Sequence, residues 1–403
     1  MRNLYSLPKK VEFCSKCVYS NQLPSSIPEY LHKPSREGAK YINFRKNLKG
    51  ENICSACDIA ELKKNINWEK REKELLKLLD KHRGKNGEYD CVVPGSGGKD
   101  SVYASHILKY KYGMNPLTVT WPPILYTDYG YENYKNWIEI GGFDNIAFKQ
   151  NGHVIKILTR LSIENLLHPF QSFILGQKNI GAKIAAKYRI PLVFYGESDA
   201  EYNNPISEFS LTRDHKYWFS NKSDKYYLAG LPISELIKKY KLKHSDLKPY
   251  LPLEKKEIKG IDIQVNYLGY FLKWVPQEAY YYSVEHTNFK PRPFRTQGTY
   301  SKYSGVDDKI DDLHFYTTYI KFGLGRATYD AAQEIRNKHI TRDEGLKLVS
   351  KFDGEFPDKY LDDVLDHIGL KKDKFIKLLD KFRSPHLWKK EGKNWQLRHR
   401  VFD

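Results

Sequence analysis

Hydrophobic positions along the chain change their spacing near residue 85. Before that point, WEKREKELLKLLDKHRG (68–84) places Trp68, Leu75 and Leu79 on one face at helical spacing, which predicts an amphipathic helix. After it, short apolar runs alternate with stretches of helical period. Strands that alternate with helices of this length indicate βαβ units. We therefore expect an α/β fold of the Rossmann-like kind, with a parallel sheet covered by helices on both faces.

The pattern also divides the chain into three regions. Strands are expected over 89–93, 116–121 and 191–196, with a further one over 145–150, and helices over 101–113, 131–142 and 164–190. Toward the C-terminus the pattern is mainly helical: 359–388 predicts two helices, and Thr341 with Glu344 forms a capping box. The predicted regions are an N-terminal region (1–67), an α/β domain with its connecting helix (68–290) and a mainly helical C-terminal region (291–403).

The segment that follows the first expected strand, PGSGGKDS (94–101), is rich in glycine. Glycine tolerates positive φ and admits a ligand close to the main chain, so Gly95, Gly97 and Gly98 can turn several N–H groups toward an anion. The helix that begins near Asp100 adds its positive N-terminal end. Because ligands of parallel sheets bind beyond the carboxyl ends of the strands, this segment predicts a phosphate site.

Four side chains of the same segment add polar groups. Ser96 and Ser101 can donate hydroxyl hydrogen bonds, and Lys99 adds a positive charge. Asp100 fits beside a phosphate where a magnesium ion bridges the two. The spacing is neither that of a Walker loop nor that of a dinucleotide fingerprint. A glycine-rich turn capped by Asp or Ser is the structural alternative.

Four of the five cysteines form two C-x-x-C pairs, Cys14/Cys17 and Cys54/Cys57, and the fifth is Cys91. Two such turns can close a tetrahedral four-thiolate site around one zinc ion, and their long separation predicts an N-terminal zinc ribbon with an inserted excursion between the pairs. A closed site of this kind has no open coordination position, so we expect it to hold structure. Redox dithiols, disulfides and an iron–sulfur cluster are the alternatives.

Charge and hydropathy narrow the class of protein. Lysine and arginine outnumber aspartate and glutamate 67 to 49, and the net charge of +18 favours a polyanionic partner such as nucleic acid, nucleotide or phosphorylated sugar. Lysines scattered over helices would equally give a solvated basic surface. The N-terminus has no apolar signal-like core, and no apolar run reaches bilayer length, so the expected compartment is the cytoplasm, with no membrane partner.

The second half of the chain carries a candidate cationic site. In KFGLGRATYDAAQEIR, Lys321 and Arg326 stand just ahead of an alanine-rich helix, together with two glycines. Cations at such a place can stabilise negative charge on a bound ligand, and these two are the candidates. The alternative is a surface basic pair at a helix start.

Acidic residues supply further candidates. Asp307, Asp308, Asp311 and Asp312 can hold a second magnesium ion or contact sugar hydroxyls; an exposed, acid-rich helix N-terminus is the other interpretation, favoured for Asp311 and Asp312. Glu197 follows an expected strand and is a candidate magnesium or substrate ligand, or else an ordinary loop carboxylate.

The run from Ser96 to Ser101 resembles the S-G-G-x-D-S pyrophosphate loop of the PP-loop ATPases. Those enzymes transfer AMP from ATP to a carbonyl oxygen, and a nitrogen or sulfur nucleophile then displaces the AMP. Residues 295–349, 168–178 and 195–198 look like the N-acetyl sugar amidotransferase family, which is similar to enzymes of surface-polysaccharide, O-antigen and flagellin-glycan synthesis that convert an acetamido into an acetamidino group. The resemblance extends from the cysteine pairs to about Phe356.

The resemblance implies a carbon–nitrogen ligase that uses ATP and Mg²⁺, with a structural Zn²⁺. The glycine loop, Glu197 and magnesium would bind the nucleotide, Asp100 would position metal, and Lys321 and Arg326 would stabilise the leaving pyrophosphate. Ammonia would then attack the imidate carbon, so no side chain need act as a covalent nucleophile.

No cysteine is left to hydrolyse glutamine, because four are assigned to metal, Cys91 lies in a buried strand and residue 2 is Arg2. We therefore expect partner proteins resembling the glutaminase and synthase of histidine biosynthesis. A tRNA-thiolating PP-loop enzyme is the competing hypothesis, favoured by the charge. It is opposed by the cysteine count, since such enzymes usually need further cysteines, so we expect no nucleic-acid partner.

Overall fold

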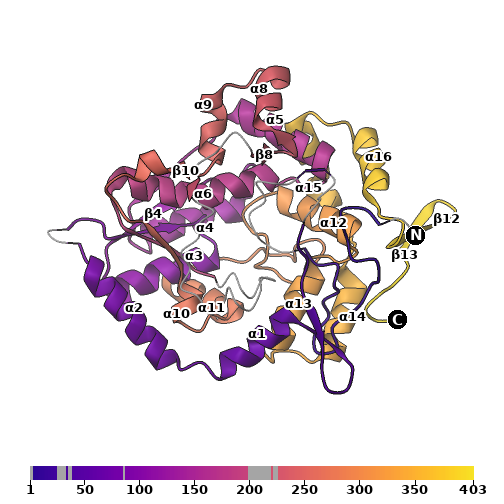
Figure 1. Ribbon diagram of the computed structural model, residues 1–403, viewed down its shortest axis with the longest axis horizontal. Coiled ribbons are helices and arrows are strands. Elements are labelled where there is room, and N and C mark those ends of the chain that lie inside the picture. The colour runs from indigo at the N-terminus through magenta and orange to yellow at the C-terminus, as the bar shows by residue number, and fades with distance from the viewer. Residues whose placement is uncertain (1–2, 25–32, 35–38, 85–86, 198–218, 221–225) are drawn as a thin grey trace.

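A five-stranded parallel sheet forms the centre of the computed structural model, which describes all residues except 1–2, 25–32, 35–38, 85–86, 198–218 and 221–225 (Figure 1). The strand order is β11-β6-β3-β4-β5, and every neighbouring pair is parallel. The strands are β3 (Cys91–Pro94), β4 (Pro116–Thr120), β5 (Asn145–Ala147), β6 (Leu192–Tyr195) and β11 (Gln264–Tyr267). These bounds agree with the predicted apolar runs, apart from β11, which the pattern did not indicate.

Side chains of the central strand β3 alternate between two helical layers. Val92 belongs to the larger apolar core, which includes α6, whereas Cys91 and Val93 pack in a separate cluster with Ala104 of α3 and Leu75 of α2. A strand covered on both faces needs apolar residues at every position, which explains its continuous apolar run. The sheet with helices on both faces confirms the predicted α/β fold.

The helices around the sheet are α2 (Trp68–His82), α3 (Lys99–His106) continued by the π-helical turn η1 (Ile107–Lys111), α4 (Asp128–Glu139), α5 (Gly152–Leu166), α6 (Gln171–Tyr188), α10 (Leu268–Phe271) and α11 (Pro276–Thr287). The predicted single helical stretch over 164–190 is wrong. It is interrupted between Leu166 and Gln171, where Leu167 adopts a left-handed conformation with φ of 47°. Pro169, which has no N–H to donate, lies two residues after Leu167 and prevents the helix from continuing.

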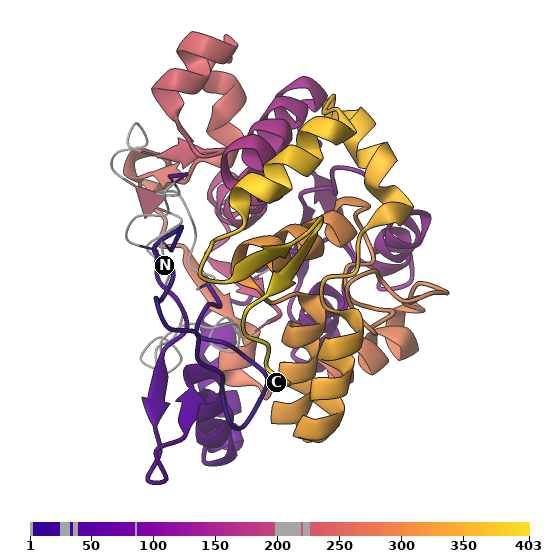
Figure 2. The same cartoon turned by 90° about the vertical axis from the view of Figure 1, so that its right-hand side faces the viewer.

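The N-terminal region lies against the C-terminal region (Figure 2). It consists of the hairpin β1 (Phe44–Lys46) and β2 (Asn52–Cys54) and the helix α1 (Ser55–Lys64). The Leu4 backbone N–H donates to Ser384 Oγ over 2.9 Å, and Tyr5 stacks on Phe382 at 5.8 Å between ring centroids. The excursion between the cysteine pairs falls partly outside the described residues.

The C-terminal region is mainly helical, as predicted. It contains α12 (Ile310–Phe322), α13 (Arg326–Arg336), α14 (Arg342–Phe352), α15 (Asp358–Ile368), α16 (Lys372–Phe382) and the hairpin β12 (Trp388–Glu391) and β13 (Asn394–Leu397). The capping box of Thr341 and Glu344 is confirmed at the start of α14. Phe375, Leu379 and Phe382 are buried, so the apolar face of α16 packs within the chain.

Smaller elements connect these regions: β7 (Phe219–Ser220) pairs with β10 (Leu253–Glu254), β8 (Tyr227–Leu228) pairs with β9 (Leu231–Pro232), and α8 (Ile233–Tyr240), α9 (His244–Leu247), η5 (Lys248–Tyr250) and η6 (Lys255–Ile258) complete the set. Among the described residues, none of the helices is both long enough and apolar enough to cross a bilayer.

Candidate active site

The glycine-rich segment lies between the carboxyl end of β3 and the start of α3, where ligands of such sheets bind. Gly97 has φ of 87°, and a Cβ there would lie 2.6 Å from the Cα of Tyr134. A Cβ on Gly95 would lie 2.2 Å from that of Ser101. The two positions therefore exclude side chains for different reasons: backbone conformation and close approach at Gly97, and helix packing at Gly95.

Three polar side chains of the segment, those of Lys99, Asp100 and Ser101, are engaged with the protein. Ser101 Oγ donates to the Gly98 carbonyl over 2.9 Å, and Lys99 Nζ lies 2.6 Å from Asp100 Oδ2. The indole Nε1 of Trp274 donates to Asp100 Oδ1 over 2.9 Å. Lys99 and Ser101 thus support the start of α3, and Asp100 is held on both of its oxygens. To give an oxygen to a metal ion, Asp100 has to separate from Lys99.

A cavity of about 600 Å³ opens beside this segment. Its walls come from the glycine loop, α4, the start and middle of α6, the segment 303–307, and the junction of α12 and α13. Lys321 and Arg326 line it together with Ser96, Lys99 and Asp100, although they are more than two hundred positions away in sequence. The structure thus brings the predicted phosphate loop and the predicted cations to one cavity.

A second cavity of about 260 Å³ lies at the carboxyl ends of β3, β6 and β11. Both cavities are lined by Ser96, Gly98, Asp100, Gln177, Lys178 and Glu197. Glu197 is half-buried and faces both spaces, as expected of a ligand-contacting carboxylate. The two cavities adjoin at these shared residues, so together they offer room for an extended ligand.

Lys321 is not a surface residue. Its side chain is buried, and its Nζ donates to the Leu166 carbonyl over 2.6 Å. The alternative of a surface basic pair is therefore wrong for Lys321. Arg326 is partly exposed to the cavity, and its guanidinium donates to Asp330 over 2.8 Å and to Ser304 Oγ over 3.2 Å. Asp330 thus fixes the direction of the Arg326 side chain.

The acidic cluster separates into residues with different surroundings. Asp308 accepts from the N–H groups of Ile124, Leu125 and Ile310 at 2.7, 3.3 and 3.0 Å, which joins the C-terminal region to the sheet domain. Asp307 lines the large cavity.

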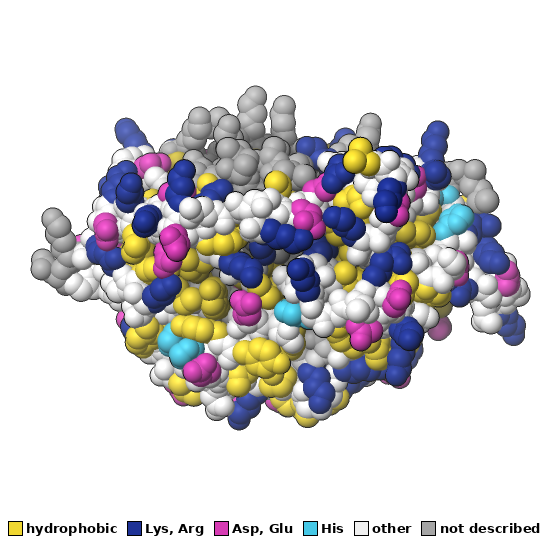
Figure 3. Space-filling view, turned by 90° about the horizontal axis from the view of Figure 1, so that it is seen from below, with side chains coloured by type: hydrophobic (Ala, Val, Ile, Leu, Met, Phe, Trp, Pro, Cys, Tyr) yellow, Lys and Arg dark blue, Asp and Glu magenta, His cyan; other side chains and the backbone are white. Residues whose placement is uncertain are grey.

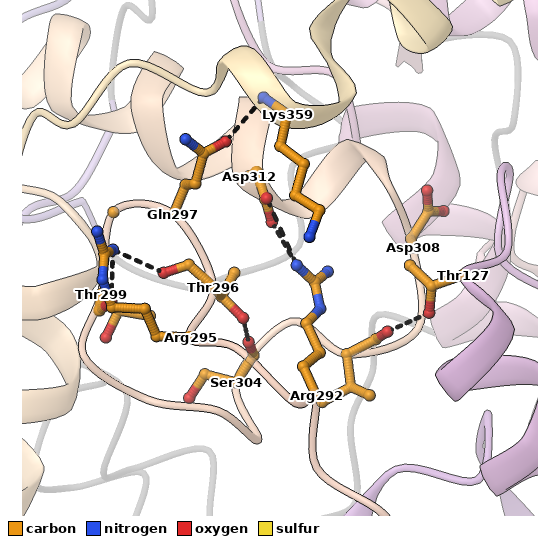
Figure 4. A network of polar contacts seen from close by, with 12 residues as sticks. Thr127, Arg292, Arg295, Thr296, Gln297, Thr299, Ser304, Asp308, Asp312 and Lys359 are labelled. Atoms are coloured by element: carbon orange, nitrogen blue, oxygen red, sulfur yellow. Dashed lines mark hydrogen bonds and ion pairs between the residues drawn. The ribbon is translucent and has the colours of Figure 1, made fainter.

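Asp312 is buried and pairs with the equally buried Arg292 over 3.0 Å, as Figure 4 shows. The prediction of an exposed helix N-terminus is therefore wrong for Asp312, and Asp311 is half-buried. Burial raises the pKa of Asp312 although Arg292 opposes this change. The pair lies in a polar network with Lys359 and the segment 295–299, behind the cavity wall that carries Ser304.

The four paired cysteines come together as a buried cluster. Cys14 Sγ lies 3.8 Å from Cys57 Sγ, Cys17 Sγ lies 3.6 Å from Cys54 Sγ, and all four sulfurs fall within 4.8 Å of one another. A tetrahedron with Zn–S bonds of about 2.3 Å has edges of about 3.8 Å. An iron–sulfur cubane places its own atoms between the thiolates and needs a wider cage. The four sulfurs can hold a metal ion, and their spacing fits one zinc ion.

The cysteine cluster is fastened to the C-terminal region. Arg342, the first residue of α14, donates to the carbonyls of Cys17 and Cys14 over 3.2 and 3.4 Å. Tyr19, just after the first pair, contacts Tyr329 edge-on at 5.8 Å, and Tyr329 lines the large cavity. Among the described residues, no other group of three or more His, Cys, Asp or Glu side chains is close enough to hold a metal.

Several cavity residues were not predicted as site residues. They are His168, Gln171, Gln177, Lys178, Asn133, Ser304 and His314. Gln171, Gln177 and Lys178 lie in α6 among apolar residues, and neither His168 nor these three carries a local motif, so only the three-dimensional arrangement identifies them as cavity residues.

Basic side chains are dispersed over the face seen in Figure 3, mixed with acidic and apolar ones. That face therefore presents no continuous cationic surface of the kind that binds a nucleic-acid backbone.

Comparisons with known proteins find similarity in parts of the chain. Residues 297–401 match the family described as LPS biosynthesis protein WbpG-like, C-terminal domain. An uncharacterized protein of Methanocaldococcus jannaschii is 42% identical over 73 residues, which are 18% of this chain and 26% of that protein. The chain thus spans about a quarter of the length of this curated relative.

Among solved structures, the U34-tRNA thiolase NcsA from Methanococcus maripaludis, with its [4Fe-4S] cluster, aligns with 80% of this chain and 88% of its own. The sequence identity is 14% and the TM-score is 0.24. The match of residues 297–401 agrees with the resemblance to surface-polysaccharide enzymes noted for residues 295–349.

Proposed function

We propose that this chain, whose residues 297–401 are WbpG-like, is an ATP-dependent enzyme that modifies an N-acetylated sugar by replacing its acetamido oxygen with nitrogen. The observation that carries the proposal is the shared cavity. A glycine loop suited to polyphosphate faces Lys321 and Arg326, which belong to the region matched to polysaccharide biosynthesis.

The loop end of the cavity suits the triphosphate of ATP. The main-chain N–H groups of Ser96, Gly97 and Gly98 and the N-terminus of α3 would hold the pyrophosphate part, and Arg326 would neutralise the charge that develops on it. Asp100 and Glu197 offer carboxylate oxygens on the cavity surface, the ligand type that magnesium prefers. Magnesium bound there would supply charge neutralisation at the phosphates.

The chemistry follows from the weakness of an amide as an electrophile. The acetamido oxygen attacks the α-phosphorus of ATP, pyrophosphate leaves, and the product is an O-adenylyl imidate. Ammonia then adds to the imidate carbon, the C–O bond breaks, and AMP leaves with that electron pair. The sugar retains an acetamidino group. The chain contributes charge stabilisation and orientation, and no covalent enzyme intermediate forms.

Ammonia would come from another protein. All five cysteines are buried: four form the metal cluster, and Cys91 lies in β3. None is an exposed thiol able to hydrolyse glutamine, because a reactive cysteine needs access and a lowered pKa, whereas burial raises the pKa of Cys91. We therefore propose a glutaminase partner with a channel protein, and a structural role for zinc in the cluster.

A tRNA-thiolating activity is the second candidate, favoured by the net charge of +18. A persulfide carrier needs an accessible thiol, and Cys91 does not provide one. The sugar reaction remains the preferred proposal.

The proposal is tested by measuring pyrophosphate release from ATP and Mg²⁺ in the presence of ammonium. A panel of sugars would include UDP-N-acetylglucosamine, UDP-N-acetylgalactosamine and N-acetylneuraminic acid, with mass spectrometry of the products. One sugar should exchange an oxygen for NH while AMP and pyrophosphate accumulate. Inert sugars, together with pyrophosphate release stimulated by unmodified tRNA and a sulfur donor, would establish the thiolase alternative.

A further inference from the structure

The cavity wall formed by residues 303–307 is fixed along its main chain. At one end, Ser301 Oγ accepts a hydrogen bond from the Tyr303 N–H over 3.2 Å. At the other end, the N–H of Thr127, just before α4, donates to the Asp307 carbonyl over 3.1 Å. Because both ends are held by the protein, side chains on this wall keep their places before a ligand arrives, which lowers the cost of binding one.

Two side chains of this wall are not engaged by the protein. Tyr303 and Asp307 both line the large cavity, and both are half-buried. Among the described residues, neither the Tyr303 hydroxyl nor the Asp307 carboxylate has a hydrogen-bond or ion-pair partner. Asp100 in the same cavity, by contrast, is held on both of its oxygens. The oxygens of Tyr303 and Asp307 are therefore available to a ligand.

Tyr303 belongs to an aromatic end of the cavity. Tyr280 of α11 stacks on it, with ring centroids 4.4 Å apart and an angle of 13° between the planes. Phe289, which also lines the cavity, contacts Tyr280 edge-on at 6.0 Å. An aromatic ring supported in this way can pack against the apolar C–H face of a sugar ring, and the tyrosine hydroxyl can bond to the sugar's polar edge.

Helix α4 sets the distance between this wall and the glycine loop. A Cβ on Gly130 would lie 2.3 Å from the Asp307 Cα, and a Cβ on Gly97 would lie 2.6 Å from the Tyr134 Cα. Gly130 and Tyr134 lie on the same face of α4, about 6 Å apart along its axis. Asp307 is therefore held about one helical turn from the phosphate loop, a span that one sugar residue can bridge.

The acidic neighbours of Asp307 do not join it as metal ligands. Asp308 already accepts three main-chain N–H groups, and Asp312 pairs with Arg292. Apart from the four cysteines, the described residues contain no group of three or more potential ligands close enough to hold a metal. A single carboxylate can still accept hydrogen bonds from two hydroxyl groups, one on each oxygen. This arrangement favours sugar hydroxyls over a second magnesium site.

We propose that Tyr303 and Asp307 form the subsite for the acceptor sugar. The Tyr303 ring packs against the sugar ring, and the Asp307 carboxylate accepts from its hydroxyl groups. The inference rests on the proposed function and names the residues that select the acceptor. Both residues lie within 297–401, the region matched to polysaccharide biosynthesis, whereas the glycine loop lies in the sheet domain. A sugar held here can turn its acetamido oxygen toward the loop, where the phosphates of ATP would bind.

Single variants separate acceptor binding from nucleotide binding. With the panel sugar that supports turnover, kcat/KM for the sugar is measured from pyrophosphate release in the presence of ammonium. It should fall by about 10- to 100-fold in Asp307→Ala and by about tenfold in Tyr303→Ala. The Kd for ATP with Mg²⁺, measured by calorimetry without sugar, should stay within about threefold of wild type in both variants.

Deoxy analogues of the same sugar test the contact with Asp307 directly. Wild-type protein should lose activity with the analogue that lacks the contacted hydroxyl. With that analogue, Asp307→Ala should cost no more than about threefold further, because the contact is already absent. A merely structural role for Asp307 would lower turnover of the parent sugar and of every analogue by the same factor.

Matched controls lie close to the same elements. Tyr281 also contacts Tyr280, with ring centroids 5.2 Å apart, and Asp128 is exposed at the start of α4; neither lines a described cavity. Tyr281→Ala and Asp128→Asn should leave both the sugar kcat/KM and the Kd for ATP unchanged. Melting temperatures of all four variants identify any loss of fold.

The inference is overturned if kcat/KM for the sugar is unchanged in both cavity variants. It is also overturned if the affinity for ATP or its dependence on Mg²⁺ falls by the same factor, because the wall would then bind the nucleotide or its metal. If the wild-type protein binds ATP but releases no pyrophosphate with any panel sugar, the proposed function fails, and the inference fails with it.

Discussion

Arg292 and Asp312 form an ion pair behind the cavity, with side chains 0% and 1% exposed, and this burial predicts a large cost for breaking the pair. In Arg292→Met, the Asp312 carboxylate loses its guanidinium partner in a site from which water is excluded. Removing one member of a buried pair costs about 3–5 kcal/mol, because the remaining charge is uncompensated. For a protein of this size we expect a fall in melting temperature of about 4–6 °C.

The pH dependence of that loss tests the cause. Burial already raises the pKa of Asp312 in the wild type, and loss of Arg292 should raise it further. A carboxyl whose folded-state pKa is raised favours the folded state below its unfolded pKa and loses that contribution as pH rises through the folded pKa. The destabilisation by Arg292→Met should therefore be larger at pH 8 than at pH 5.

Two further variants serve as comparisons for Arg292→Met. Their melting temperatures are measured by thermal unfolding followed by circular dichroism. Arg292→Met combined with Asp312→Leu should be more stable than Arg292→Met alone, because no buried charge remains. Lys372→Met removes an exposed pair with Asp362, whose side chains are 55% and 74% exposed, and should shift the midpoint by less than about 2 °C. A loss in Arg292→Met that is no larger than this, or that is independent of pH, would refute the reasoning.

Three further predictions concern the loop and the cluster. Gly97→Ala forces a left-handed alanine against the backbone of Tyr134, so pyrophosphate release should fall more than about 100-fold, while the melting temperature changes by only a few degrees; unchanged turnover would contradict the role of the loop. Trp274→Phe removes a donor to Asp100 and should lower kcat/KM for ATP by about tenfold, measured by pyrophosphate release, with little change in folding. Chelation, or Cys17→Ser, should release one zinc per chain by metal analysis and lower both stability and turnover; iron and labile sulfide in place of zinc would overturn the metal assignment.

Local sequence signals were sufficient for the centre of the sheet. The apolar run before Gly95 and the glycines after it specify a strand, a turn and a helix start within one short segment, and the structure has all three. The cysteine spacing likewise specified the cluster, since each C-x-x-C turn fixes two sulfurs locally.

The parts of the fold and of the candidate site that the sequence did not predict depend on contacts between segments that are distant in sequence. Strand β11 is short, and half of its residues are polar. It forms because its backbone pairs in parallel with the edge of β6. Trp274 donates a hydrogen bond to Asp100, and Arg292 forms an ion pair with Asp312. No local sequence pattern predicts either contact, because it depends on how the chain folds. His168 and His314 stack because α5 and α6 are interrupted near Pro169 and α12 packs against this interruption. The sequence near either histidine therefore gives no indication of the other.

The arrangement of the cavity assigns different tasks to the two halves of the chain. Under the proposed function, the glycine loop would contact the phosphates of ATP, which every ATP-using reaction shares, so it would not select the acceptor. Ser304, Asp307 and His314 come from the matched region 297–401, and they face the loop across the cavity. Specificity for the acceptor should therefore depend on this region, whereas activation of the acceptor depends on the sheet. Lys321 of α12 bonds the carbonyl of Leu166 in α5, so this wall of the cavity is built from both halves of the chain.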